Sequence, residues 1–397
     1  MLKDIPKRFY YVSLFFVIYG LGRSLLSPFF PKYVQGIVGN LGFLGIVFAI
    51  PSIMSAIFDI PFGDLTDYFG RKKLMMFAVS IIATTVFSYV FISQAWQIVL
   101  VQIFVGIGGA MLWVPGRAMT KDLLKKKVAT EEMALFAVLV NFTLLGASLG
   151  GYIAEKFGYN ANFLLSALLA IAAIIFLKKK VIETRKKTKK FLHASKDAFL
   201  SFKIYFKDIN WFLHQGKAVM SIFIVAAVLY SWYAASGAFI PLFLFQKFNA
   251  DLFTVGIVLT LINLPFMSIE YFFGKISDRI GEWKMFGAGL LISGIFASSV
   301  FFSSSILVFT ALNILVSVGN TILEPLIESI TGKHVSKSRR GRLSAIINSG
   351  KDLGAVIGVI FAGFLAQAAG IPSVFLFGGI SFLLCYGLVL YFRKKSK

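Results

Sequence analysis

The chain has little of what soluble enzymes use for chemistry. It holds one cysteine, three histidines and 18 acidic residues among 397, and 15% of its residues are charged, against about 25% in an average soluble domain. The single cysteine, Cys385, excludes an internal disulfide and a cysteine-based metal site. No metal-ligand spacing or phosphate-binding loop occurs. These shortages argue against a soluble enzyme and predict neither a metal nor a cofactor.

Apolar residues take the place of the missing polar ones. They make up 58% of the chain, 44 of them phenylalanine, and the mean hydropathy is +0.82. A helix needs about 20 apolar residues to cross a bilayer. Twelve such runs occur: 9–31, 41–62, 74–94, 97–120, 133–154, 160–177, 218–245, 252–273, 285–303, 305–331, 343–367 and 372–392. The sequence predicts an all-α membrane protein with twelve transmembrane helices, arranged as an N-terminal bundle (1–177), a basic linker (178–217) and a C-terminal bundle (218–397).

The basic residues predict the orientation of these spans. If the N-terminus is cytoplasmic, 35 of the 40 Lys and Arg residues fall in inner segments and three in outer ones, as the positive-inside rule requires. Both termini should therefore be cytoplasmic. We interpret the net charge of +22 as a signal of membrane orientation, so it does not predict a nucleic-acid partner. Within the linker, apolar residues from Leu192 to Leu213 recur at helical spacing, which predicts an amphipathic cytoplasmic helix. A disordered basic tether is the alternative.

The second half of the chain repeats the first. The segment Gly63 to Lys73 reads GDLTDYFGRKK, and Gly274 to Lys284 reads GKISDRIGEWK at an offset of 211. Pro115 and Pro325 correspond at an offset of 210. Because six spans separate equivalent points, the two halves should have the same orientation in the membrane.

The GDLTDYFGRKK loop resembles the G-x-L-x-D-x-x-G-R-K motif of the major facilitator superfamily, and the layout of six plus six spans is similar over the whole chain. The resemblance implies two six-helix bundles around a cavity that opens alternately to either side. It also implies that the motif and its repeat act in gating. Asp59 and Glu270 each precede a motif glycine by four residues, and this repeated position suggests a gating contact between the bundles. The gating candidates are Gly63, Asp67, Gly70, Arg71, Gly274, Asp278, Gly281 and Glu270. The alternative is that the loop only connects two helices and that its basic residues fix the membrane topology. That alternative would explain the lysines but not the aspartates.

Two positions depart from the patterns of proton-coupled and drug-exporting members of this family. Proton-coupled members often carry an arginine four residues before a glycine, in the pattern R-x-x-x-G, whereas this chain has Gln102 before Gly106. Residues 146–151, GASLGG, lack the proline of the antiporter motif G-P-x-x-G-G. The departures weaken the antiporter interpretation without removing it. The same stretch contains G-x-S-x-G, but it lies in an apolar helical run and lacks the strand that a hydrolase elbow needs. We therefore predict that the protein is not an enzyme.

Ionisable residues within the spans are functional candidates, because each costs free energy at membrane depth unless it is paired or hydrated. Arg23 lies fourteen residues into the first span and could attract an anionic substrate or pair with a carboxylate. Glu324 lies beside Pro325, one turn before Glu328. An ion pair between Glu324 and Lys351 is expected, either as a static bridge or as a site that binds and releases a proton. The proton-coupling candidates are Glu324, Glu328, Lys351, Asp352 and Asp59, and the cavity candidates are Arg23, Tyr19, Gln102, Trp113, Trp232, Asn320 and Glu324.

These observations predict a monomeric secondary transporter in the cell membrane that moves a small molecule by alternating access. Spans rich in aromatic residues and poor in polar ones favour proton-coupled efflux of an amphipathic or drug-like compound. Uptake or facilitated transport of an organic anion or sugar-like metabolite through Arg23 is an alternative. A membrane sensor or scaffold that transports nothing, and binds a partner through its basic linker, is the rival of another class.

Overall fold

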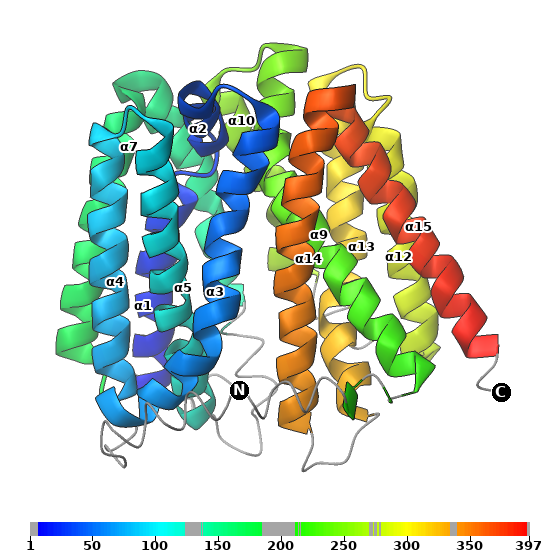
Figure 1. Cartoon of the computed structure of the whole chain (residues 1–397), viewed down its shortest axis with the longest axis horizontal. Coiled ribbons are helices and arrows are strands. Elements are labelled where there is room, and N and C mark those ends of the chain that lie inside the picture. Colours follow the sequence, from blue (N-terminus) through cyan, green and yellow to red (C-terminus); the bar gives the residue numbers. More distant parts are fainter. Residues whose placement is uncertain are drawn as a thin grey trace. The chain divides into compact units, whose positions relative to one another are not determined.

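The computed structural model describes residues 7–123, 136, 138–184, 211–212, 214, 216–269, 273, 276–277, 279–333 and 340–394. Within these residues the chain is helical (Figure 1). The α-helices are α1 (Lys7–Ser24), α2 (Phe30–Val38), α3 (Leu41–Phe69), α4 (Arg71–Ser88), α5 (Ala95–Leu123), α7 (Gly146–Lys180), α9 (Lys217–Phe248), α10 (Leu252–Ser268), α12 (Glu282–Val300), α13 (Ile306–Lys333), α14 (Arg340–Ala369) and α15 (Pro372–Lys394), with short 3₁₀ helices at Tyr89–Phe91 (η2) and Phe142–Leu145 (η3). The amphipathic helix expected in the linker lies almost wholly outside the described residues.

Nine helical stretches in the described part of the chain are long and apolar enough to cross a membrane. One of them, Val138–Lys180, has 43 residues and contains two expected spans. They meet at Gly158, whose φ of 79° is non-helical and is a conformation that glycine adopts without strain. The helix α10 is shorter, and its apolar stretch is Leu252–Met267.

The first expected span is not one continuous helix. The helix α1 ends at Ser24, and the backbone turns before α2 begins at Phe30. Pro28 has no N–H to continue the α-helical pattern, and the Ser27 N–H instead donates to the Ser24 carbonyl three residues back. Arg23 therefore lies in the last turn of α1, whereas the sequence placed it inside an unbroken span.

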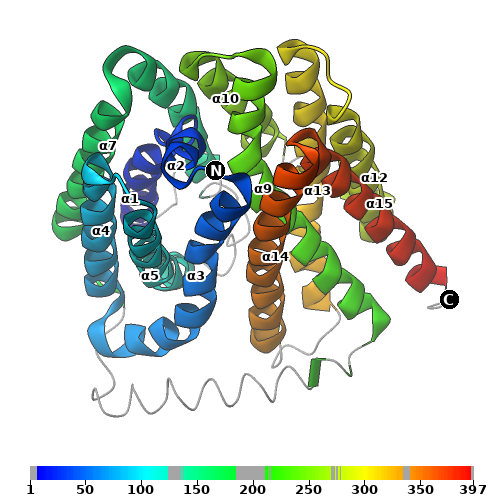
Figure 2. The same cartoon turned by 45° about the horizontal axis from the view of Figure 1, so that its top comes forward.

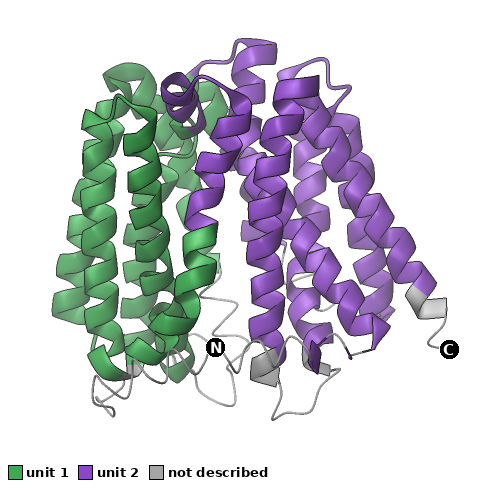
Figure 3. Ribbon diagram, in the orientation of Figure 1, with its two compact units in different colours: residues 1–30, 53–204, 252–257 green, residues 31–52, 205–251, 258–397 purple. Residues whose placement is uncertain are grey.

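The chain divides into two compact units (Figure 3). Unit 1 contains residues 1–30, 53–204 and 252–257, and unit 2 contains residues 31–52, 205–251 and 258–397. Each unit therefore includes a segment from the other half of the sequence. The bundle boundaries at 177 and 218 derive from the internal repeat and stay a prediction.

In unit 1, α4 packs on α5 and α7, and α1 packs on α7 (Figure 2). Buried polar side chains join these helices, since Ser166 donates through Oγ to the Gly22 carbonyl at 2.8 Å. The first turn of α10 joins the unit through Glu155 of α7, whose Oε2 accepts the Leu252 N–H at 2.9 Å. A carboxylate near the N-terminus of a helix is favourable because the backbone N–H groups there lack helical partners.

In unit 2, α9 packs along α14, and α12 packs on α13 and α15. The α9–α14 contact is close, because a Cβ at Gly354 would collide with the backbone of Ala227. Close approach through small residues is a usual way for helices to associate in lipid. The start of α3 joins this unit through Gln367 of α14, whose Oε1 accepts the Gly42 N–H at 2.9 Å.

Candidate functional site

A cluster of charged and aromatic side chains lies where α9, α13 and α14 of unit 2 meet. The Nζ atom of Lys351 is 3.7 Å from Oε1 of Glu324 and 3.7 Å from Oε1 of Glu328. The Tyr230 hydroxyl donates to the same Glu324 oxygen at 2.7 Å. Lys351 Nζ also lies 4.9 Å from the centroid of the Tyr230 ring, within the range of a cation–π interaction. We call these four residues the Lys351 cluster.

The members of the Lys351 cluster differ in burial. The side chain of Lys351 is 8% exposed, that of Glu324 32% and that of Glu328 76%. A buried ammonium needs compensating charge and hydrogen-bond acceptors, and the two carboxylates of α13 supply both. The ion pair expected between Glu324 and Lys351 is therefore present. Asp352, the next residue of α14, is half-buried.

Tyr230 was missed as a member of this site by the sequence analysis. Its sequence signal is weak, since it is one of 14 tyrosines in a chain that is 16% aromatic. Only the packing of α9 against α13 brings its hydroxyl to a residue 94 positions away.

A second ion pair lies inside unit 1. Arg117 of α5 places Nη2 at 3.7 Å from Oδ2 of Asp59 of α3, with side-chain exposures of 52% and 29%. The sequence analysis counted Arg117 only as a topology signal. The structure adds Arg117 as the partner of Asp59, which the sequence had proposed for proton coupling or gating.

Several expected cavity residues are occupied in packing. Gln102 is 3% exposed and accepts the Tyr89 hydroxyl at 2.9 Å. Asn320 is 1% exposed and accepts the Ser293 hydroxyl at 2.9 Å. Both amides thus tie neighbouring helices together within a unit. Their contact with a substrate stays a prediction.

The aromatic candidates and Arg23 fall in different surroundings. Tyr19 is 8% exposed, and Trp113 stacks on Phe16 with 5.0 Å between ring centroids. Arg23 is exposed at the end of α1. Trp232 is 5% exposed and lies on α9 two residues after Tyr230.

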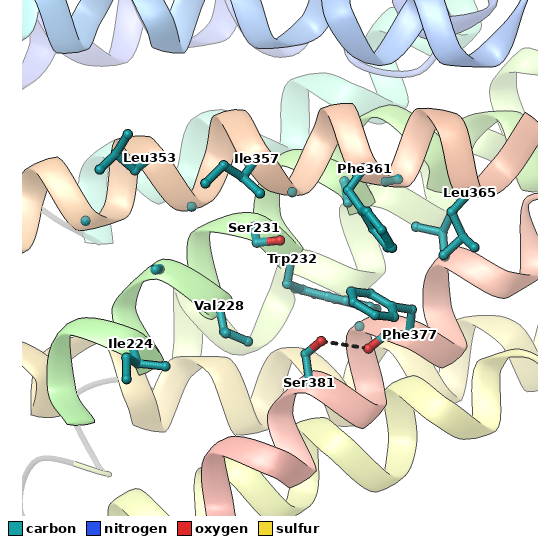
Figure 4. Close-up of a pocket in the computed structure, with 18 of the residues that line it drawn as sticks. Ile224, Val228, Ser231, Trp232, Leu353, Ile357, Phe361, Leu365, Phe377 and Ser381 are labelled. Carbon is teal, nitrogen blue, oxygen red and sulfur yellow. Dashed lines mark hydrogen bonds between the residues drawn. The ribbon is translucent and has the colours of Figure 1, made fainter. Parts of the chain in front are cut away.

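Trp232 lines an apolar cavity of about 470 Å³ between α9, α14 and α15. Figure 4 shows Ile357 and Phe361 of α14 and Phe377 of α15 around it. The labelled hydroxyl of Ser381 is engaged with the Phe377 carbonyl at 2.9 Å. The cavity therefore offers hydrocarbon and aromatic contacts and little hydrogen bonding.

The motif loop of unit 1 forms a polar network at the start of α4. Gly70 precedes α4 with a φ of 84°, and Gly281 precedes α12 with a φ of 98°, so the repeated glycines share a backbone conformation that other residues rarely adopt. Arg71 is 6% exposed, pairs with Asp122 and donates to the Ala118 carbonyl at 2.7 Å. The sequence analysis found Arg71 but not Asp122.

A second carboxylate joins this network from beyond α7. Glu183 accepts the N–H groups of Arg71 and Lys72 at 3.1 and 2.9 Å, so it caps the N-terminus of α4. Gly63 is exposed. Glu270, Gly274, Asp278 and the side chain of Asp67 lie outside the described part of the chain, so their gating role stays a prediction.

Long apolar helices with ion pairs between them define a multi-pass integral membrane protein. The sequence profile described as Major Facilitator Superfamily matches residues 12–236 and 221–397. The chain belongs to the major facilitator superfamily. It is therefore a membrane transporter of the cell membrane and not an enzyme, with the lipid bilayer and a small-molecule substrate as its partners.

Relatives along nearly the whole chain are named as transporters. The multi-drug resistance efflux pump PmrA homolog of Lactococcus lactis is 25% identical, and the match covers 97% of this chain and 95% of the relative. An uncharacterized MFS-type transporter of Methanocaldococcus jannaschii is 24% identical over 94% of each chain. The multidrug resistance protein MdtG of Klebsiella pneumoniae is 23% identical, over 90% of this chain and 86% of the relative.

Solved structures share the fold at low sequence identity. A POT family transporter in complex with 5-aminolevulinic acid superposes with a TM-score of 0.81 at 12% identity, covering 100% of this chain and 98% of that one. The human organic anion transporter MFSD10 gives a TM-score of 0.69 at 16% identity, covering 97% and 100%.

Proposed function

We propose that this protein is a secondary transporter that exports an amphipathic or drug-like compound in exchange for protons. Twelve spans with cytoplasmic termini would form two bundles that expose a central site alternately to each side. The nine long apolar stretches of the described residues account for ten of these spans, because Val138–Lys180 contributes two. The helices α1 and α10 supply the other two. The network at Gly70 and the repeated turn at Gly281 serve as gates.

The Lys351 cluster is the observation that carries the proposal. It joins three helices through one carboxylate, because Glu324 contacts both the Tyr230 hydroxyl and Lys351 Nζ. A proton added to Glu324 removes its attraction for Lys351, which then keeps only Glu328 as its carboxylate partner. A change of that kind alters contacts between helices and so biases a conformational equilibrium.

The apolar surfaces favour an amphipathic substrate. The cavity beside Trp232 is lined almost entirely by aliphatic and aromatic side chains. One relative named as a multi-drug resistance efflux pump and one named as a multidrug resistance protein support export, although each of those names describes the relative alone.

Flux measurements on reconstituted protein test proton coupling. Ethidium, a fluorescent amphipathic dye, is followed in proteoliposomes with and without a pH gradient. We expect the gradient to accelerate flux in the wild type and to have no effect in Glu324→Gln, because the amide cannot exchange a proton.

Glu328→Gln is the matched control, since it makes the same change one turn away on the same helix, at the same distance from Lys351, in a side chain that is 76% exposed. We expect it to keep the gradient dependence. Wild-type flux that ignores the gradient would contradict proton coupling.

A further inference from the structure

Lys351 occupies a place that suits a positively charged ligand. Its Nζ lies between two carboxylates and near a tyrosine ring, at 3.7, 3.7 and 4.9 Å. Carboxylates and aromatic faces are the groups that recognise organic cations. The side chain of Lys351 thus acts as a tethered cation in a site with cation-binding chemistry.

The charge balance of the site favours a cationic ligand. When both are ionised, Glu324 and Glu328 carry two negative charges against the one positive charge of Lys351. Access is also uneven, because Lys351 is 8% exposed whereas Glu324 is 32% and Glu328 76% exposed. A ligand can therefore reach the carboxylate oxygens before it displaces the ammonium group.

Aromatic rings extend from this site along unit 2. The rings of Tyr230 and Tyr233 are 5.4 Å apart, and those of Tyr233 and Phe266 are 6.1 Å apart, between centroids. Such a row offers contact for an apolar or aromatic body attached to a cationic centre. Charge and apolar surface therefore lie next to each other.

From this geometry we infer that the Lys351 cluster binds lipophilic organic cations, which replace Lys351 Nζ at Glu324 and over the Tyr230 ring. Lys351 is then an internal competitor that holds the site when no substrate is present. The inference rests on the proposed transport function and adds the substrate class. It disfavours the organic-anion alternative, which depended on Arg23.

Two ions of the same shape and opposite charge test the inference. Tetraphenylphosphonium and tetraphenylborate are titrated by calorimetry into the full-length wild type in detergent, without any pH gradient, and empty micelles correct for partitioning. We expect the phosphonium to bind, with an affinity that falls as salt is added, and the borate to show no saturable binding. Saturable binding of the borate alone, or equal binding of both ions, would overturn the inference.

Variants then locate the binding site. Lys351→Met removes the competitor and should tighten phosphonium binding about tenfold, whereas Tyr230→Leu should weaken it about tenfold by removing the ring. Tyr391→Leu makes the same change at a tyrosine of α15 that is 54% exposed, and it serves as the control with near wild-type affinity. Glu324→Gln should abolish saturable binding, and unchanged affinity in Glu324→Gln would place the cation elsewhere.

Failure of this inference can be told apart from failure of the proposed function. Binding is measured at equilibrium without a gradient, so loss of proton coupling leaves it unchanged. Gradient-driven flux of ethidium with no phosphonium binding would leave transport standing and reject the cation site.

Discussion

Two ion pairs of the same length lie in different surroundings in the two units. Arg117 and Asp59 of unit 1 approach to 3.7 Å, with the arginine side chain 52% exposed. Lys351 and Glu324 of unit 2 also approach to 3.7 Å, but the lysine is 8% exposed. An exposed pair contributes little to stability, whereas removing one member of a buried pair leaves an uncompensated charge. Burial of the cation, and not distance, therefore distinguishes the two pairs.

The internal repeat sharpens this contrast. The offset of 210 between Pro115 and Pro325 also relates Glu324 to Val114. The offset of 208 between Leu145 and Leu353 also relates Lys351 to Thr143. The first half therefore has neutral residues where the second half has this ion pair. Halves related by the sequence repeat thus differ in chemistry at equivalent positions.

The largest expected effect comes from removing the counter-charge of the buried cation. Glu324→Gln leaves the buried Lys351 ammonium group with only the exposed Glu328 as its carboxylate partner, so we expect the free energy of unfolding to fall by about 3 kcal/mol. Thermal unfolding in detergent measures this loss. The double variant Lys351→Met/Glu324→Gln should recover part of it, because the stranded ammonium group is then gone. A double variant less stable than the single one would argue against the pairing.

The smallest effect is expected at the exposed pair. Arg117→Gln should change the free energy of unfolding by less than about 1 kcal/mol, because solvent already screens this guanidinium. The same unfolding assay checks the value, and the gradient dependence of ethidium flux should persist. A loss as large as that in Glu324→Gln would erase the distinction between the two pairs.

The sequence predicted the fold well where one physical constraint dominated. Hydrocarbon thickness fixes the length of a span, so the apolar runs coincide with the helices, and the break before the sixth run coincides with the turn at Gly158. The first span was wrong in its continuity, because Pro28 interrupts the helix soon after Arg23. The twelve-span count and the orientation stay predictions.

Side-chain partners were harder to predict than helices. The pair of Glu324 with Lys351 was expected because both are charged at similar depth in neighbouring spans. Tyr230, Asp122 and Glu183 were missed because their roles depend on how helices distant in sequence rotate against one another, which hydropathy does not encode. Gln102 was assigned to the cavity from its motif position and Asn320 from its polarity, and both are engaged in helix packing.

Proton release on substrate binding tests most directly whether Glu324 exchanges a proton for a cation. Tetraphenylphosphonium is added to purified protein in weakly buffered solution at mildly acidic pH, and the pH of the solution is recorded. In the proposed exchange cycle, Glu324 pairs with Lys351 when it is ionised and holds a proton in the alternate state. We expect the wild type to acidify the solution as the cation displaces the proton from that alternate state, and Glu324→Gln to cause no change. A wild type that binds the cation without releasing a proton would contradict exchange at this carboxylate.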